Sequence, residues 1–160
     1  MNLNDNARAG GFCITDPAVV IDDSAKADLE ITPINMLYVI DSLHYTVASG
    51  EGDIKLDDTE DSTIADGYSR LYLACIIADG TISVVVGPAI DNTNVPFVAQ
   101  WPTPTEDSIP FCGILVTNET GSVFTAGTTT LETTSIFCNI YDLFTIPAKP
   151  LTAVASTQQT

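Results

Sequence analysis

The chain offers few side chains that could do acid–base chemistry. Its one histidine is His44, which excludes a metal site with two histidines and leaves a single candidate base for a catalytic triad. Asp41 and Ser42 lie close to it in sequence. Neighbours on one hairpin do not place a nucleophile and a base in line, however. The sequence therefore predicts no catalysis through His44.

The cysteines show no metal-binding spacing. None of the four forms a C-x-x-C pair, and three lie in apolar, strand-like runs where a free thiol behaves as a small hydrophobic side chain. We expect buried thiols, with a disulfide and a metal site as the alternatives. The four are Cys13, Cys75, Cys112 and Cys138.

Acidic residues gather between residues 51 and 66. A calcium loop beginning at Asp57 would need glycine where Ser62 stands and a bidentate glutamate where Tyr68 stands, so the EF-hand pattern fails. Solvated carboxylates are the simplest interpretation, and an irregular calcium site is the alternative. Glycoside hydrolysis would need two acids converging in a cleft, whereas these acids share one loop.

Other short motifs are weak. Gly10-Gly11 lacks the spacing of a phosphate-binding loop, and no G-K-[ST] occurs. Asn118-Glu119-Thr120 matches a glycosylation sequon, which has no meaning in a protein that is not secreted. The sequence thus predicts a protein that is not an enzyme and uses no metal or other cofactor.

Charge and hydropathy limit the partners. Twenty-one acids against five bases give a formal net charge of −16, and such a surface repels nucleic acid, which is bound through Lys and Arg. The N-terminus has no apolar signal segment, and no apolar run approaches the roughly 20 residues that span a bilayer. We expect synthesis in a cytoplasm, with neither nucleic acid nor membrane as a partner.

The positions of these side chains depend on strands, above all on the hairpin Arg70–Ile90. Asp79-Gly80 separates two apolar runs, which predicts a type I′ turn. Residues 71–78 are almost uniformly apolar, so this strand is expected to be covered on both faces. One face of its partner strand is marked by Ile82, Val84 and Val86.

Further strands follow from alternation and apolar runs. A helix over residues 34–40 competes with the first of them. Together they give about seven to nine short strands and predict an all-β protein, an antiparallel β-sandwich or barrel-like domain. The segments are a hairpin at residues 34–48 turning at Asp41-Ser42, a strand at 111–118 returning at 122–125, and a last strand at 135–146.

The two ends of the chain differ from the middle. Residues 1–33 are predicted to form an extended N-terminal arm, 34–146 the β-domain and 147–160 a flexible C-terminal tail. The alternative for the arm is an irregular segment packed on its own domain. In the proline-rich loop, Trp101 is either a packed anchor or an interface residue. The expected partner-binding anchors of the arm are Phe12, Ile14, Val19, Val20 and Ile21.

The order of elements from about residue 34 to 145 resembles that of tailed-bacteriophage capsid decoration, or cement, proteins. The segments that carry the resemblance are YVIDSLHYTVAS, YLACIIADGTISVVVG, PFCGILVTNETG, VFTAGTTTL and IFCNIYDLF. The resemblance implies a non-enzymatic virion protein on the capsid exterior that binds and stabilises the shell of the major capsid protein. It also implies a homo-oligomer, a trimer on a threefold position.

Two other functions fit the same strand pattern. One is a tail, neck or fibre-base subunit of the virion. The other is a carbohydrate- or host-binding β-domain, in which Trp101, Tyr68 and Tyr72 would stack on a ligand.

Overall fold

Every element of the computed structural model is a β-strand in the part of the chain that it describes, residues 11–24, 26–32, 36–41, 43–48, 53–57, 62–93 and 100–143. Twelve strands form four antiparallel sheets that pack together. The prediction of an all-β, sandwich- or barrel-like protein is confirmed.

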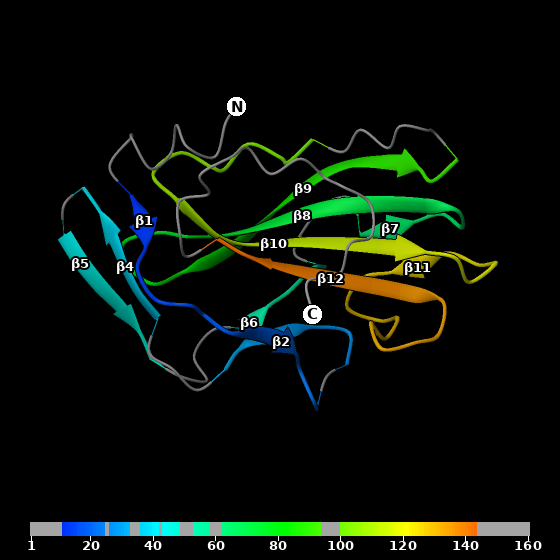
Figure 1. Ribbon diagram of the computed structural model, residues 1–160, viewed down its shortest axis with the longest axis horizontal. Helices are drawn as coiled ribbons and strands as arrows, with labels where there is room; N and C mark the ends of the chain where they lie inside the picture. Colours follow the sequence, from blue (N-terminus) through cyan, green and yellow to red (C-terminus); the bar gives the residue numbers. More distant parts are fainter. Residues whose placement is uncertain are drawn as a thin grey trace.

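The largest sheet contains four strands in the order β12-β10-β8-β9 and runs across the molecule (Figure 1). Its centre is the pair β8 and β10, and β8 continues into β9 through the predicted hairpin. The bounds are β8 Tyr68–Ile76, β9 Ile82–Asp91, β10 Ile109–Asn118 and β12 Ile136–Asp142.

The turn of this hairpin differs from the predicted type I′ geometry. The Ile77 amide donates to the Thr81 carbonyl at 3.2 Å, which leaves a three-residue loop. Gly80 has a φ of 90°, whereas Asp79 is not among the residues with positive φ. The Asp79 carboxylate instead accepts the Thr81 amide at 2.8 Å. The side chain thus organises the loop, and only glycine occupies the left-handed position.

The second predicted hairpin is also present, so the competing helix over 34–40 was wrong. Strands β4, Met36–Ile40, and β5, Leu43–Val47, pair in antiparallel register, and Asp41 at the turn has a φ of 51°. The short strand β1, Phe12–Cys13, lies on the other side of β4. The order of this sheet is β1-β4-β5.

Two small sheets complete the molecule. Strands β2, Val19–Ile21, β3, Leu29–Ile31, and β6, Asp53–Ile54, form one of them. In the other, β11, Phe124–Thr125, pairs with β7, Thr63–Ile64. The chain after residue 118 was predicted to return along the preceding strand. It pairs with β7 instead, because β8 and β12 already occupy both edges of β10.

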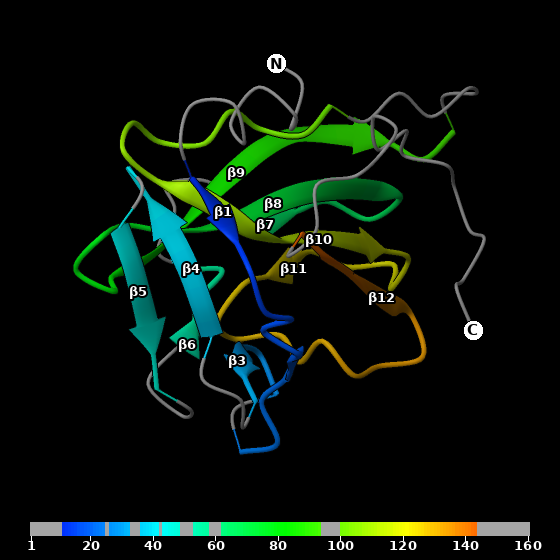
Figure 2. The same ribbon diagram turned by 60° about the vertical axis from the view of Figure 1, so that its left-hand side comes forward.

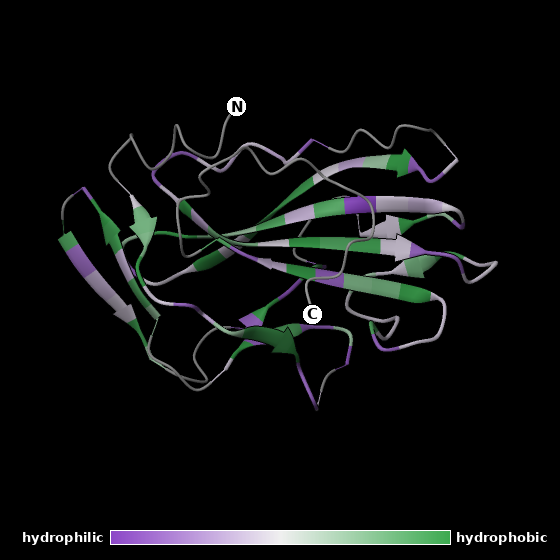
Figure 3. Cartoon of the chain, viewed as in Figure 1, coloured by the Kyte–Doolittle hydropathy of each residue, from purple (hydrophilic) through white to green (hydrophobic). Residues whose placement is uncertain are grey.

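One core lies between the large sheet and the smaller ones. Tyr72, Ala74 and Ile76 of β8 point into it and meet side chains from the other sheets, among them Ile31 and Tyr38. Every side chain of β8 from residue 69 to 76 is buried, which confirms that both faces of this strand are covered as far as Ile76. The prediction for residues 71–78 was wrong at its end, because the strand stops at Ile76 and Ala78 is exposed in the turn. Figure 3 shows the apolar stretches along the strands of this sheet.

The opposite face of the large sheet carries a second, smaller cluster. Leu73, Cys75 and Leu143 are buried there, and Trp101 packs against them. The edge of the Trp101 ring meets Tyr141, with centroids 5.7 Å apart at 81°. Trp101 is half-buried, and its side chain packs on the sheet as an anchor in this chain. The alternative, that it also lies in an interface, stays a prediction.

The Trp101 ring lies over Gly113 of β10. A Cβ at residue 113 would be 2.5 Å from Cη2 of Trp101, closer than real Cβ contacts come. Glycine is therefore required here for space and not for backbone freedom.

We expect Gly113→Ala to lower the free energy of unfolding by about 1–3 kcal/mol, because the ring must shift or leave its site. Denaturant unfolding would measure the loss, and tryptophan emission would report the ring. The matched background is Trp101→Ala, in which the same substitution should cost about 0.5 kcal/mol or less. Equal costs in both backgrounds would contradict this account of Gly113.

Candidate docking surface

The described part of the N-terminal segment is extended and lies on the body of the protein. Strand β1 pairs with β4, while β2 and β3 pair with each other and β3 pairs with β6. The boundary drawn at residue 33 therefore does not separate two packing units, because β3 contributes Leu29 and Ile31 to the main core. Residues 1–10 and 144–160, which include the predicted tail, lie outside the described residues.

The pleat of these strands sorts the five predicted anchors into two groups. Successive side chains of a strand point to opposite faces. Val19 is buried and Ile21 packs partly buried against the main core. Phe12, Ile14 and Val20 are 42%, 38% and 39% exposed. We call these three exposed side chains the apolar arm surface.

Hydrogen bonds fix the backbone behind this surface. The Ile14 amide donates to the Leu37 carbonyl at 2.8 Å, and the Leu37 amide donates to Oγ1 of Thr15 at 2.7 Å. Between β1 and β2 the chain turns at Ala18, whose φ is 45° and whose amide donates to the Asp16 carboxylate at 2.8 Å. The exposed apolar side chains thus stand on an ordered backbone.

Among the described residues three further large apolar side chains are exposed, and none of them was predicted to lie at the surface. Leu43 is 60%, Val123 59% and Phe137 47% exposed. Phe137 lay within a predicted apolar strand, so alternation alone could have assigned it to the outer face. Val123 lay within the predicted returning strand at 122–125, whereas β11 begins only at Phe124.

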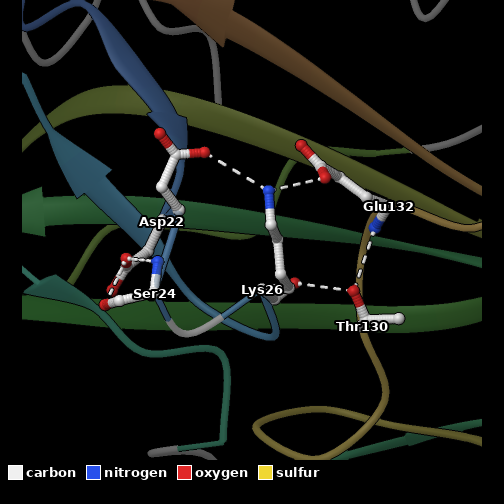
Figure 4. A network of polar contacts seen from close by, with 6 residues as sticks. Asp22, Ser24, Lys26, Thr130 and Glu132 are labelled. Carbon is white, nitrogen blue, oxygen red and sulfur yellow. Dashed lines mark hydrogen bonds and ion pairs between the residues drawn. The ribbon is translucent and has the colours of Figure 1, made fainter.

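A polar network ties the turn between β2 and β3 to the loop before β12 (Figure 4). The Lys26 ammonium lies 2.7 Å from the Glu132 carboxylate and 3.3 Å from that of Asp23. The Lys26 carbonyl accepts the Leu131 amide at 2.8 Å and the Thr130 hydroxyl at 3.4 Å. The hydrogen bond to Glu132, and then the one to Asp23, raises the pKa of Lys26. Exposed ion pairs of this kind contribute little stability. The hydrogen bonds accepted by the Lys26 carbonyl therefore hold the turn and the loop together.

Asp28 lies near other acidic side chains in the part of the structure next to Lys26. Its Oδ1 is buried and accepts no hydrogen bond. Burial raises the pKa of its carboxyl, and repulsion from Asp57, Asp22 and Asp53 adds to the effect while Lys55 opposes it. The described residues contain no group of three or more His, Cys, Asp or Glu side chains arranged to hold a metal ion.

The acidic loop is described only in part. Asp53, Asp57 and Asp66 are exposed, and the Asp66 carboxylate accepts the Gly121 amide at 2.8 Å. The loop carboxylates at residues 51, 58, 60 and 61 lie outside the described residues. An irregular calcium site that used them would lie outside the described residues too.

All four cysteines are free thiols, and Cys13, Cys75 and Cys112 are buried as expected, whereas Cys138 is half-buried. Burial raises the pKa of Cys75 to about 11 and those of Cys13 and Cys138 to about 12. The pKa of Cys112 is also raised, again mainly by burial. Thiols with such pKa values are almost entirely protonated at neutral pH and are poor nucleophiles.

The remaining residues that the sequence offered as functional candidates are either buried in structural roles or have no catalytic partner beside them among the described residues. His44 is exposed on β5, and no catalytic partner is placed beside it by the hydrogen bonds of the described residues. Asn118 is fully buried and its amide donates to the carbonyls of Ile64 and Ser122 at 2.9 and 2.8 Å, so the sequon serves as a structural clamp. Tyr72 is fully buried and therefore cannot stack on a carbohydrate ligand.

Comparison with known proteins finds no matching family model, no matching curated protein and no matching solved structure. Within the described residues, no helix has the length and hydrophobicity needed to span a membrane.

The pKa of Asp28 predicts a pH-dependent substitution effect. A carboxyl whose pKa is raised on folding loses its proton less readily in the folded state than in the unfolded state. Ionisation of Asp28 therefore destabilises the fold as the pH rises above 3.8, the ordinary pKa of an aspartate carboxyl. We expect Asp28→Asn to raise the free energy of unfolding at pH 7 by up to about 1 kcal/mol. The gain should vanish below about pH 3, where both states bind the proton.

Chemical denaturation across this pH range would test it. The matched control is Asp53→Asn, which removes the same formal charge from an exposed neighbour and should gain less. A stabilisation by Asp28→Asn that is equal at all pH values would refute the electrostatic explanation.

Proposed function

We propose that this chain is a non-enzymatic structural protein of a tailed-bacteriophage virion that decorates the outside of the capsid and stabilises the shell of the major capsid protein. The observation that carries the proposal is the apolar arm surface, Phe12, Ile14 and Val20, on an extended segment held against a rigid β scaffold. The resemblance of residues 34–145 to decoration proteins supports the same function.

Order in this segment favours tight docking. A binding segment that is disordered before it binds loses conformational entropy on docking, which subtracts from affinity. Here the backbone of β1 and β2 is already hydrogen-bonded to β4 and β3. Binding then has to order little beyond the side chains of the apolar arm surface.

Charge supports a position outside the shell. Only three of the bases, Lys26, Lys55 and Arg70, lie in the described residues. Lys26 is ion-paired and Arg70 is buried. The exposed surface is therefore strongly acidic, which disfavours contact with packaged DNA. A cyclic homo-oligomer, the trimer implied by the resemblance, is part of the proposal.

Copy number separates decoration from the alternative of a tail, neck or fibre-base subunit. We expect quantitative mass spectrometry of purified particles to find this chain at a ratio comparable to the major capsid protein, because decoration repeats over the whole shell. A ratio of a few per cent would instead assign it to the tail or a single vertex. Absence from particles would contradict every virion function.

Replacing the apolar arm surface should abolish docking while the protein stays folded. We expect the triple variant Phe12→Ser, Ile14→Ser, Val20→Ser to bind undecorated heads at least about tenfold more weakly, since that factor requires only about 1.4 kcal/mol of lost apolar contact. Co-sedimentation with heads measures the binding, and circular dichroism checks the fold.

The matched control is Val123→Ser, Phe137→Ser, which removes apolar side chains of similar exposure from other strands and connections. Its binding should stay close to that of the unmodified chain. Unchanged binding by the triple variant would reject the apolar arm surface as the docking site even if the copy number matched decoration.

A further inference from the structure

Strand β5 is the outer strand of its sheet. In the order β1-β4-β5, no other described strand pairs with its outer edge. Figures 1 and 2 both show β5 at the periphery of the molecule, with β4 on its inner side. An open edge of this kind is a template for pairing with another strand.

The register identifies the backbone groups at this edge. The N–H and C=O of one residue in an antiparallel strand point to the same side, and successive residues alternate. Both groups of Leu37 are turned toward the β1 side of β4, where they bond to Thr15 and Ile14. Tyr38 therefore bonds toward β5 and its register partner Tyr45 bonds back toward β4.

His44 and Thr46 alternate with Tyr45, so their N–H and C=O groups point away from β4. Both side chains are exposed, and Leu43 at the start of the strand is 60% exposed. Within the described residues nothing pairs with these four backbone groups, which stand open between exposed side chains.

This edge lacks the features that usually protect a terminal strand. No Lys, Arg, Asp or Glu occurs between Asp41 and Glu51, and β5 contains no proline. The outer strands of the large sheet differ, because β9 contains Pro88 and Asp91 and β12 contains Asp142. Charges and prolines on an edge strand oppose pairing with another chain.

We propose that β5 is a self-association surface that pairs antiparallel with β5 of a second copy about a twofold axis at Tyr45. In this register His44 of each copy faces Thr46 of the other, and all four outward backbone groups form hydrogen bonds. Leu43 of each copy faces Val47 of the other. The two three-stranded sheets then become one six-stranded sheet.

Charge is the reason to propose a second copy of this chain as the partner of the open edge of β5. The chain has a net charge of −16, so acidic parts of its surface repel another copy, whereas β5 lets two copies approach without juxtaposing acids. An uncharged edge equally offers nothing to a basic partner. The contact is isologous and closes at two copies, so it is distinct from the cyclic contact of the proposed trimer and does not depend on the proposed function.

A five-residue strand pair buries little area, so the association is weak in dilute solution. Sedimentation equilibrium of the full chain from about 10 μM to about 1 mM covers the expected range of dissociation constants. We expect an even-numbered association whose dissociation constant rises at least about tenfold in Thr46→Pro, because proline removes an outward N–H without touching the bonds to β4. The matched control Thr46→Val keeps the N–H and should associate like the unmodified chain.

Hydrogen exchange of the unmodified chain tests the proposal even if the Thr46→Pro variant does not fold. The amides of His44 and Thr46 should become protected as concentration rises. A second variant, His44→Asp with Thr46→Asp, places acids across the axis and should also dissociate the pair. A chain that stays monomeric at about 1 mM, or associates with these two amides unprotected, overturns the proposal. So does an association that Thr46→Pro leaves unchanged while circular dichroism shows an intact fold.

Discussion

Strand β8 must be covered on both of its faces, and most of the architecture follows from that requirement. A strand whose residues 69–76 are all buried cannot lie on the surface of a simple two-layer sandwich with one wet side. On one face the three smaller sheets supply the cover. On the other face, part of it comes from the loop that carries Trp101. The close approach of that ring is allowed because residue 113 on the neighbouring strand is glycine.

The same requirement explains why the N-terminal segment lies on the domain. Leu29, Ile31 and Val19 fill the main core beneath the large sheet, so removing them would expose the inner face of that sheet. Since a strand has two faces, burying one set of side chains presents the alternate set to solvent. The exposed Phe12, Ile14 and Val20 are thus a geometric result of how this segment completes the core, and the proposed docking function uses that result.

Local signals were sufficient for the fold class and for the long strands. The apolar run from Leu71 and the Asp79-Gly80 breaker identified the central hairpin, because such signals depend only on neighbouring residues. The predicted turn type was wrong, since the hydrogen bond that the Asp79 carboxylate accepts from the Thr81 amide decides between turns that share one sequence signature. The pairing of β11 with β7 was also missed, because strand neighbours far apart in sequence depend on which edges of the sheet remain free.

The candidate surface could be predicted only in part for a related reason. The sequence singled out five apolar residues of the arm as expected anchors, but not which of them face outward. That division depends on which side of β2 the core lies, and therefore on pairing with β3 and β6. Burial of Tyr72 and Asn118 was likewise set by segments distant in the chain. The sequence alone had left Tyr72 as a candidate for ligand stacking, and it gave no sign of the structural role of Asn118.

The connection between the β2–β3 turn and the loop before β12 has a consequence for biosynthesis. The amide of Leu131 donates to the carbonyl of Lys26, and β2 lies near β12, so early and late parts of the described chain pack against each other. On a ribosome, the N-terminal strands emerge long before the loop at Leu131 and β12 are made, and this part of their packing stays incomplete in the interval. Such non-local closure slows folding and exposes the nascent chain to aggregation. Folding of this protein is therefore expected to finish only after nearly the whole chain has left the exit tunnel, which makes its yield sensitive to chaperone supply and to premature termination.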